Sequence, residues 1–228
     1  MHICFLGTNE RLAYLQNHAS VGVKLDNMTD FVGKTLRPSS IESRAEELEL
    51  AFWIIERSVE AEKRGFDAII TGCFGDPGVE AARERVRIPV IAPGETALLT
   101  ARMISHYFSI ISPLPETVPL AREQTHKAGV HPFVASIEAF NMPVEKIRER
   151  DPKTIESLIV LARKCVEQDG AEAIVCACAS MSLLAEEIAP EIGVPVLNSV
   201  RLSLRAAEML VGAGLTHSRV TFPKPVKL

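Results

Sequence analysis

The 228-residue sequence has few aromatic residues, no long hydrophobic run and no excess of positive charge. Aromatic side chains make up 5% of the chain, which argues against a protein that stacks successive nucleic-acid bases. The 25 basic and 29 acidic residues give a formal charge of −4 without a basic stripe, so we expect no nucleic-acid partner. The apolar runs are far shorter than the ~20 residues of a membrane-spanning helix, so we expect no membrane association.

The five cysteines are widely dispersed, and no residue pattern indicates a metal or a nucleotide. Met1–Leu6 lacks the basic flank of an export signal, which together with an odd number of scattered cysteines predicts reduced thiols and a cytoplasmic protein. Cys176-x-Cys178 has no second pair, and the six histidines are dispersed, so no metal is expected. The glycines at positions 72, 75 and 78 fit neither dinucleotide nor P-loop spacing, so no cofactor is expected.

What the sequence does contain is short aliphatic runs that alternate with amphipathic stretches, the pattern typical of βα units and parallel sheets. The composition, 47% hydrophobic and 24% charged, is that of an ordinary globular protein with one sizeable domain or two small ones. Strands are expected at His2–Leu6, Ala68–Thr71, Val90–Ile91, Tyr107–Ile111, Ala173–Cys176 and Val194–Leu197. Helices are expected at Ser43–Arg64, Val79–Arg85, Glu95–Ser105, Thr117–Ala128, Thr154–Gln168, Met181–Ile188 and Val200–Val211.

One stretch of the sequence recurs in a similar form. The segment at 65–70 returns at 170–175, and Cys178 follows the second copy as Cys73 follows the first. The similar composition of βαβ units explains the repeated strands, but packing does not require a cysteine in both loops. We therefore predict two similar α/β lobes related by a pseudo-twofold axis. Lobe one is expected at residues 1–95, with 200–228 packing back on it, and lobe two at 96–199.

Cys73 and Cys178 each follow a predicted strand, where parallel sheets bind ligands near helix N-termini. A helix N-terminus favours a thiolate, so we expect a lowered thiol pKa there. Asp76 is predicted to cap the helix after Cys73, and Ser180 the helix after Cys178. The alternative is that cysteines are small buried hydrophobic residues. That alternative suits Cys4, Cys165 and Cys176.

Two equivalent thiols on facing lobes suit the inversion of a carbon stereocentre. Inversion needs a base on one face of the carbon and an acid on the other, and the two groups exchange roles after each turnover. A hydrolase of the Cys–His type would instead need one thiol with a positioned base. No histidine lies near either cysteine loop in the sequence.

Segments around both cysteines resemble a known family. Residues 73–78 (Cys-Phe-Gly-Asp-Pro-Gly) and 172–181, with weaker matches at Pro38–Glu42, 108–111 and 116–119, are similar to the aspartate/glutamate/hydantoin racemase superfamily, and most of all to its hydantoin and allantoin racemases. The resemblance implies a cofactor-independent racemase or epimerase with Cys73 and Cys178 as its two catalytic bases. It also implies two flavodoxin-like lobes, an active site in the cleft between them, and a homo-oligomer.

The sequence departs from the family pattern where it is expected to line the cleft. Residues 7–10 (Gly-Thr-Asn-Glu) replace the usual Asn-Pro-Asn-Thr, Ala179-Ser180 replaces Ala-Gly, and Asn198-Ser199 replaces Asp-Gly. These changes concern the substrate more than the reaction type. Phe74-Gly75 is similar to the branch that accepts a neutral ring, whereas amino-acid racemases tend to carry Asn-Thr there.

Removing a proton beside a carbonyl builds negative charge on oxygen, which needs preorganised hydrogen-bond donors. Ordinary loop or capping roles are the alternative for each candidate donor. The candidates are backbone groups of Phe74, Gly75, Ala179 and Ser180, the side chains of Thr8 and Asn9, and Ser112 and Thr117 beside the fourth predicted strand. The small-molecule substrate expected is a 5-substituted hydantoin or a similar ureide. The alternatives are an amino-acid racemase of the same superfamily and a non-catalytic small-molecule-binding protein on the same scaffold.

Overall fold

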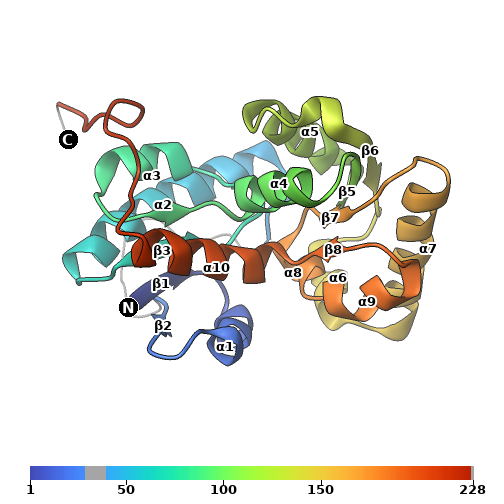
Figure 1. Cartoon of the computed structure of the whole chain (residues 1–228), viewed down its shortest axis with the longest axis horizontal. Coiled ribbons are helices and arrows are strands. Elements are labelled where there is room, and N and C mark those ends of the chain that lie inside the picture. Colours follow the sequence, from blue (N-terminus) through green and yellow to red (C-terminus); the bar gives the residue numbers. More distant parts are fainter. Residues whose placement is uncertain (29–39, 227–228) are drawn as a thin grey trace.

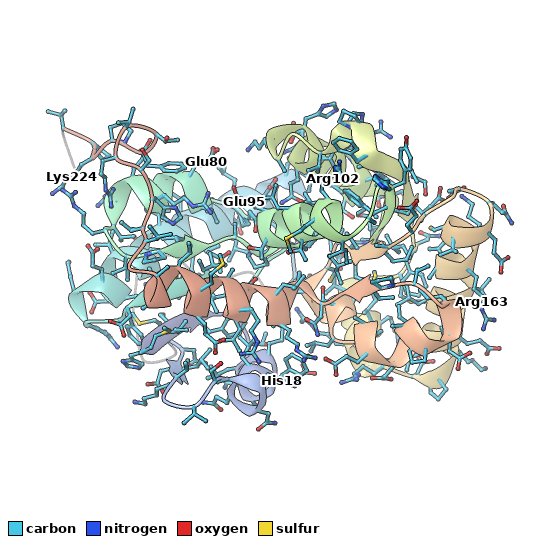
Figure 2. All side chains as sticks on the ribbon, in the orientation of Figure 1. His18, Glu80, Glu95, Arg102, Arg163 and Lys224 are labelled. Atoms are coloured by element: carbon cyan, nitrogen blue, oxygen red, sulfur yellow. The ribbon has the colours of Figure 1, made fainter. Side chains whose placement is uncertain are left out.

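The computed structural model describes residues 1–28 and 40–226, and it contains two α/β lobes that lie side by side (Figure 1). Within the described residues each lobe holds a four-stranded sheet whose strand pairs are all parallel. The described helices include none that is long and apolar enough to cross a membrane. Figure 2 shows charged side chains around the outside of the ribbon, among them Arg163 and Lys224.

Lobe one contains the sheet with strand order β2-β1-β3-β4. Strands β1, β3 and β4 are aliphatic and almost entirely buried, because helices cover both faces of the sheet. The strands are β1 (His2–Leu6), β2 (Lys24–Asp26), β3 (Ala68–Thr71) and β4 (Val90–Ile91). Helices α1 (Asn9–His18), α2 (Arg44–Lys63) and α3 (Val79–Arg85) belong to this lobe, and α4 (Pro93–Ile104) follows β4 along the chain.

Lobe two repeats that arrangement with the order β6-β5-β7-β8, which is also how flavodoxin-like sheets begin. Its strands are β5 (Phe108–Ser112), β6 (Val134–Ala139), β7 (Ile174–Cys176) and β8 (Val196–Leu197). Its helices are α5 (Val118–Lys127), α6 (Val144–Glu149), α7 (Pro152–Glu167), α8 (Ala179–Ser182) and α9 (Ala185–Ile192), with short 3-10 turns at Pro115–Thr117 and His131–Phe133. The two sheets confirm the predicted fold class of two similar parallel α/β lobes.

The helices that follow the last strand of each sheet are exchanged between the lobes. In α4, Ala97, Leu98 and Ala101 pack in the cluster that covers one face of the lobe-two sheet. Helix α10 (Ser199–Gly212) follows β8 but places Val200, Leu204 and Ala207 against β1 and β3 of lobe one. Figure 1 shows α10 running across the molecule from one lobe to the other. This reciprocal packing fastens the lobes together and fixes the space between them.

The six predicted strands are present, but two strands and two helices were not predicted. Strand β2 is a three-residue edge strand, and β6 is half-buried with polar Ser136 and Glu138, so neither shows an aliphatic run. Helix α1 has few apolar residues and buries Arg11, and α6 is short. The predicted helix Met181–Ile188 is wrong, because the chain forms α8 and α9 with a break at residues 183 and 184.

Candidate active site

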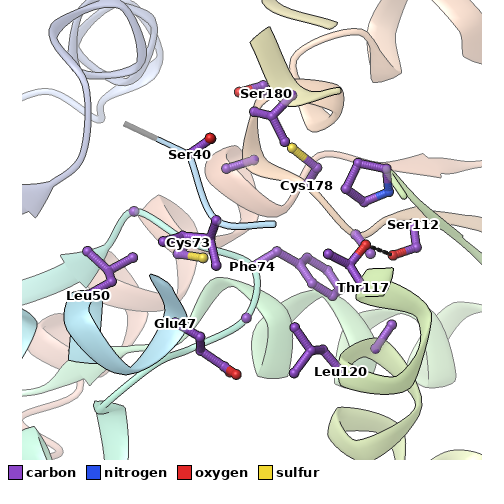
Figure 3. A pocket seen from close by; sticks show the side chains of 18 of the residues that line it. Ser40, Glu47, Leu50, Cys73, Phe74, Ser112, Thr117, Leu120, Cys178 and Ser180 are labelled. Atoms are coloured by element: carbon purple, nitrogen blue, oxygen red, sulfur yellow. Dashed lines mark hydrogen bonds between the residues drawn. The ribbon is translucent and has the colours of Figure 1, made fainter. Parts of the chain in front are cut away.

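A pocket lies between the lobes, at the carboxyl ends of β3 and β7 (Figure 3). Lobe one supplies the loop after β3 and the first turns of α2, and lobe two supplies the loop after β7 and parts of α5 and α6. The lining combines apolar side chains, such as Leu50 and Leu120, with a few polar ones. This is the place where doubly wound sheets bind ligands.

Cys73 reaches the pocket from the end of β3. Gly72 precedes it where β3 lies directly against β1, and a Cβ there would lie 2.4 Å from the Leu6 carbonyl oxygen. The backbone N–H of Gly75 donates a hydrogen bond to the Cys73 sulfur. Burial nevertheless raises the pKa of the Cys73 thiol to about 12, so this group carries its proton at neutral pH.

Cys178 reaches the same pocket from the other lobe, one residue before α8 begins. It is 9% exposed and packs against the lobe-two core. Figure 3 shows Cys73 and Cys178 on different elements around the same space. After burial and the charge of Asp76, the charge of Cys178 also raises the Cys73 pKa. All five cysteines lie among the described residues, and all are unpaired.

The other three cysteines lie in the core. Cys4, Cys165 and Cys176 are fully buried, and burial raises the pKa of each thiol. They belong to strands β1 and β7 and to the inner face of α7. Their prediction as small hydrophobic residues is confirmed.

The structure gathers most of the predicted site residues around the two thiols. On the lobe-two side, the hydroxyl groups of Ser112 and Thr117 are hydrogen-bonded to each other at 2.8 Å (Figure 3). Ser180 accepts a hydrogen bond from the Arg148 Nε at 3.4 Å. The predicted residues that line the pocket are Cys73, Phe74, Gly75, Ser112, Thr117, Cys178, Ala179 and Ser180. In the weakly matching segment Pro38–Glu42, Ser40 and Ile41 also line it, while positions 38 and 39 lie outside the described residues.

Thr8 and Asn9 do not reach the pocket. The Thr8 hydroxyl caps α1 by accepting from the backbone and side chain of Arg11, and Asn9 is exposed and bonded to Asn27. The residue of this segment that lines the pocket is Arg11, one helical turn further on. Arg11 was not predicted as a site residue, because no helix was predicted at α1.

Glu47, Gln124 and Arg148 also line the pocket without having been predicted. Glu47 is half-buried in the first turn of α2, where burial raises its carboxyl pKa. In the sequence, the only indication of Glu47 was its place near the start of the predicted helix Ser43–Arg64. Arg148 belongs to the unpredicted α6, so no sequence signal pointed to it.

Three local predictions about the cysteine loops are wrong. Asp76 caps α4 rather than α3, because its carboxylate accepts from the N–H groups of Gly94 at 3.0 Å and Glu95 at 2.7 Å. Ser180 lies inside α8 and caps nothing. The expected lowering of the Cys73 pKa is reversed, because α3 begins only at Val79 and burial dominates.

The Asp76 carboxylate joins the Cys73 loop to its surroundings. Burial raises its pKa to about 7, although the Gly94 and Glu95 N–H groups favour the charged form. Gln124, from α5 of lobe two, donates to the Phe74 carbonyl at 2.6 Å and lies 3.4 Å from Asp76. A loop of one lobe is thereby bonded to a helix of the other.

Among the described residues no group of three or more His, Cys, Asp or Glu side chains is placed to hold a metal ion.

These features define a class of protein: a duplicated parallel α/β fold whose two lobes each present one thiol to a shared pocket. The family model described as Asp/Glu/Hydantoin racemase matches residues 26–207. A hydantoin racemase of Rhizobium meliloti is 36% identical over 209 residues, covering 91% of this chain and 84% of that protein. A hydantoin racemase of Paenarthrobacter aurescens is 32% identical over 232 residues, covering 100% and 98%. The crystal structure of allantoin racemase from Pseudomonas fluorescens superposes with a TM-score of 0.91 at 30% identity, covering 100% and 98%.

The chain belongs to the Asp/Glu/hydantoin racemase family. It is a racemase, and hence an isomerase.

Proposed function

We propose that the protein inverts a carbon beside a carbonyl of a cyclic ureide, most specifically a 5-substituted hydantoin, with Cys73 and Cys178 as its two bases and no cofactor. The observation that carries the proposal is the placement of the two thiols. They follow equivalent strands of a duplicated fold, and both line one pocket. A pair of chemically identical groups on facing lobes is what inversion in both directions requires.

In this mechanism one cysteine starts as a thiolate and the other as a thiol. The thiolate removes the proton from the stereogenic carbon, and the electron pair of the broken C–H bond moves toward the carbonyl to form an enolate. The opposite thiol then donates its proton to the other face of the carbon, and its own electron pair stays on sulfur. The enzyme is left with the two protonation states exchanged, ready for the opposite enantiomer.

The enolate oxygen needs donors that are in place before the proton moves. Backbone N–H groups of Ala179 and Ser180 open α8 beside Cys178, where the first turn of a helix has no acceptors of its own. The hydroxyl pair of Ser112 and Thr117 lies on the same side of the pocket. We assign these groups to the carbonyl oxygens of the ring.

Two observations support a neutral ring as the substrate: the apolar residues that line the pocket and the names of the similar proteins. Phe74, Leu50, Ile41, Leu120 and Val144 give the pocket apolar walls that suit a ring and its substituent. Three similar proteins are called hydantoin racemases, and two similar solved structures are of allantoin racemases. Hydantoin and allantoin share a five-membered ureide ring with an acidic C–H beside a carbonyl.

The proposal also concerns the setting of the reaction. Five unpaired cysteines are typical of a reducing compartment such as the cytoplasm. The family resemblance implies a homo-oligomer, which sedimentation or light scattering of the purified protein tests directly.

The test is a screen of enantiopure 5-substituted hydantoins, allantoin, aspartate and glutamate for loss of optical rotation, with and without exhaustive chelation. We expect turnover of a ureide, undiminished by EDTA, and none of the amino acids. Turnover of aspartate or glutamate alone would replace the substrate class. Thermal stabilisation by a ureide without turnover of either enantiomer would show a binding protein instead.

A further inference from the structure

Arg11 is a buried cation on the Cys73 side of the pocket. Arg11 is 4% exposed and belongs to helix α1, which follows strand β1. The guanidinium donates to the Gly72 carbonyl oxygen at 2.6 Å and to the Thr8 hydroxyl at 3.0 Å. Gly72 immediately precedes Cys73, so the charge is held next to the backbone that carries the thiol.

The charges around Cys73 do not all act in the same direction. Burial dominates and raises the thiol pKa, and the negative charges of Asp76 and Cys178 raise it further. The positive charge of Arg11 lowers it. Among the described residues, Glu47 from α2 and Arg148 from α6 are the other charged side chains in the pocket lining.

A two-base racemase forms the Cys73 thiolate once in every pair of opposite turnovers. A thiolate in this half-buried position is costly unless a positive charge or a hydrogen-bond donor lies close by. Among the described residues that line the pocket, Arg11 is the cation bonded to the Cys73 loop, and an arginine keeps its charge at every working pH. Its bond to Gly72 also fixes the distance between the charge and the cysteine.

We propose that Arg11 is a positioning residue that stabilises the Cys73 thiolate by its charge. The inference rests on the proposed function for its catalytic consequence, since it assumes that Cys73 acts as a base. The effect on the thiol itself needs no substrate, so the two claims are tested separately.

The experiment measures the pH dependence of alkylation by iodoacetamide at Cys73, read by peptide mass spectrometry in the full-length protein. Arg11→Gln keeps a donor for the Gly72 carbonyl but removes the charge, and Arg11→Lys keeps the charge. Arg11→Met is a second neutral variant that retains an unbranched stem. Alkylation of Cys178 in the same samples is the internal control, and circular dichroism verifies folding of each variant.

The neutral variants should move the alkylation profile of Cys73 to higher pH, which lowers its rate about tenfold per pKa unit on the rising limb. Arg11→Lys should stay near the wild type, and the Cys178 profile should move less than that of Cys73. The same neutral variants should shift the alkaline-rising limb of kcat/KM upward in pH. Unchanged Cys73 profiles in folded Arg11→Gln and Arg11→Met would overturn the proposal, even if the protein racemises hydantoins.

Discussion

Asp76 shows how a single residue connects the cysteine loop with the rest of the molecule. It lies three residues after Cys73, adopts a φ of 50°, and accepts hydrogen bonds from the first turn of α4. Its carboxyl pKa is raised by burial to about 7, above the usual value of 3.8. Because the folded state binds the proton more tightly than the unfolded state, ionisation of Asp76 costs stability. This contribution to stability is fully present below about pH 4 and is lost as the pH rises to about 7.

Replacing Asp76 with Asn should remove that pH dependence. We expect the free energy of unfolding of Asp76→Asn, relative to the wild type, to rise between pH 4 and pH 7 and then to level off. Urea titrations at closely spaced pH values measure the difference. A constant difference across this range would show that Asp76 has an ordinary pKa in the folded protein.

Gly94 is the second residue on which the cysteine loop depends. A Cβ at this position would lie 2.1 Å from the Phe74 carbonyl oxygen and 2.7 Å from the Gln124 Nε2. Gly94→Ala should therefore push the Cys73 loop away from α4 and α5, lower stability by about 1–3 kcal/mol and reduce kcat/KM more than tenfold.

Gly212→Ala is the matched control for that substitution, because a Cβ at Gly212 meets nothing within 4 Å. It should leave activity unchanged and raise stability by at most about 1 kcal/mol. Thermal unfolding and initial-rate assays on both variants make the comparison. Equal activities of Gly94→Ala and Gly212→Ala would contradict the close packing of this loop.

At the scale of elements, sequence patterns predicted those parts of the fold that are apolar and regular. The aliphatic strands β1, β3 and β4 stand out because both faces of the sheet are buried. The helical spacing of Leu158, Ala162 and Cys165 likewise predicted α7. Helix α1 was missed because its buried face carries an arginine, which bonds the Gly72 carbonyl just after β3, a contact that no local pattern reveals.

The same limit applied to the candidate site. The repeat in the sequence predicted that both cysteines follow equivalent strands, and eight of the ten predicted site residues line the pocket. The repeat did not reveal that the Asp76 carboxylate accepts a hydrogen bond from the first turn of α4, since strand β4 separates the two residues in the sequence. Nor did it reveal Arg148, because the position of α6 depends on how lobe two folds.

The first turn of α7 offers a test of element stability away from the pocket. The Asp151 carboxylate caps the helix by accepting from the N–H groups of Lys153 and Thr154 at 3.0 and 3.1 Å. Asp151→Ala should cost about 1 kcal/mol of unfolding free energy and leave kcat and KM unchanged. Chemical denaturation with a parallel activity assay checks this. A loss of activity without a loss of stability would mean that α7 takes part in the site.

At the scale of the whole molecule, duplication and helix exchange explain why the pocket has two similar sides. Each lobe ends in a helix that packs on the other lobe, and each offers a cysteine from the loop after its third strand in the chain. The bonds from Gln124 to the Cys73 loop hold the lobes in register at the pocket itself. An architecture of this kind presents two thiols to one pocket from two lobes.

The most direct test of the account is proton exchange in D₂O by Cys73→Ser and Cys178→Ser, followed by NMR of each enantiopure hydantoin. Serine is a far weaker base than a thiolate at neutral pH, so neither variant should racemise. Each should still replace the proton of one enantiomer with deuterium, through its remaining cysteine, and the two variants should prefer opposite enantiomers. The double variant and an enzyme-free sample give the background rate. Racemisation by either single variant, or exchange of the same enantiomer by both, would contradict the two-thiol mechanism.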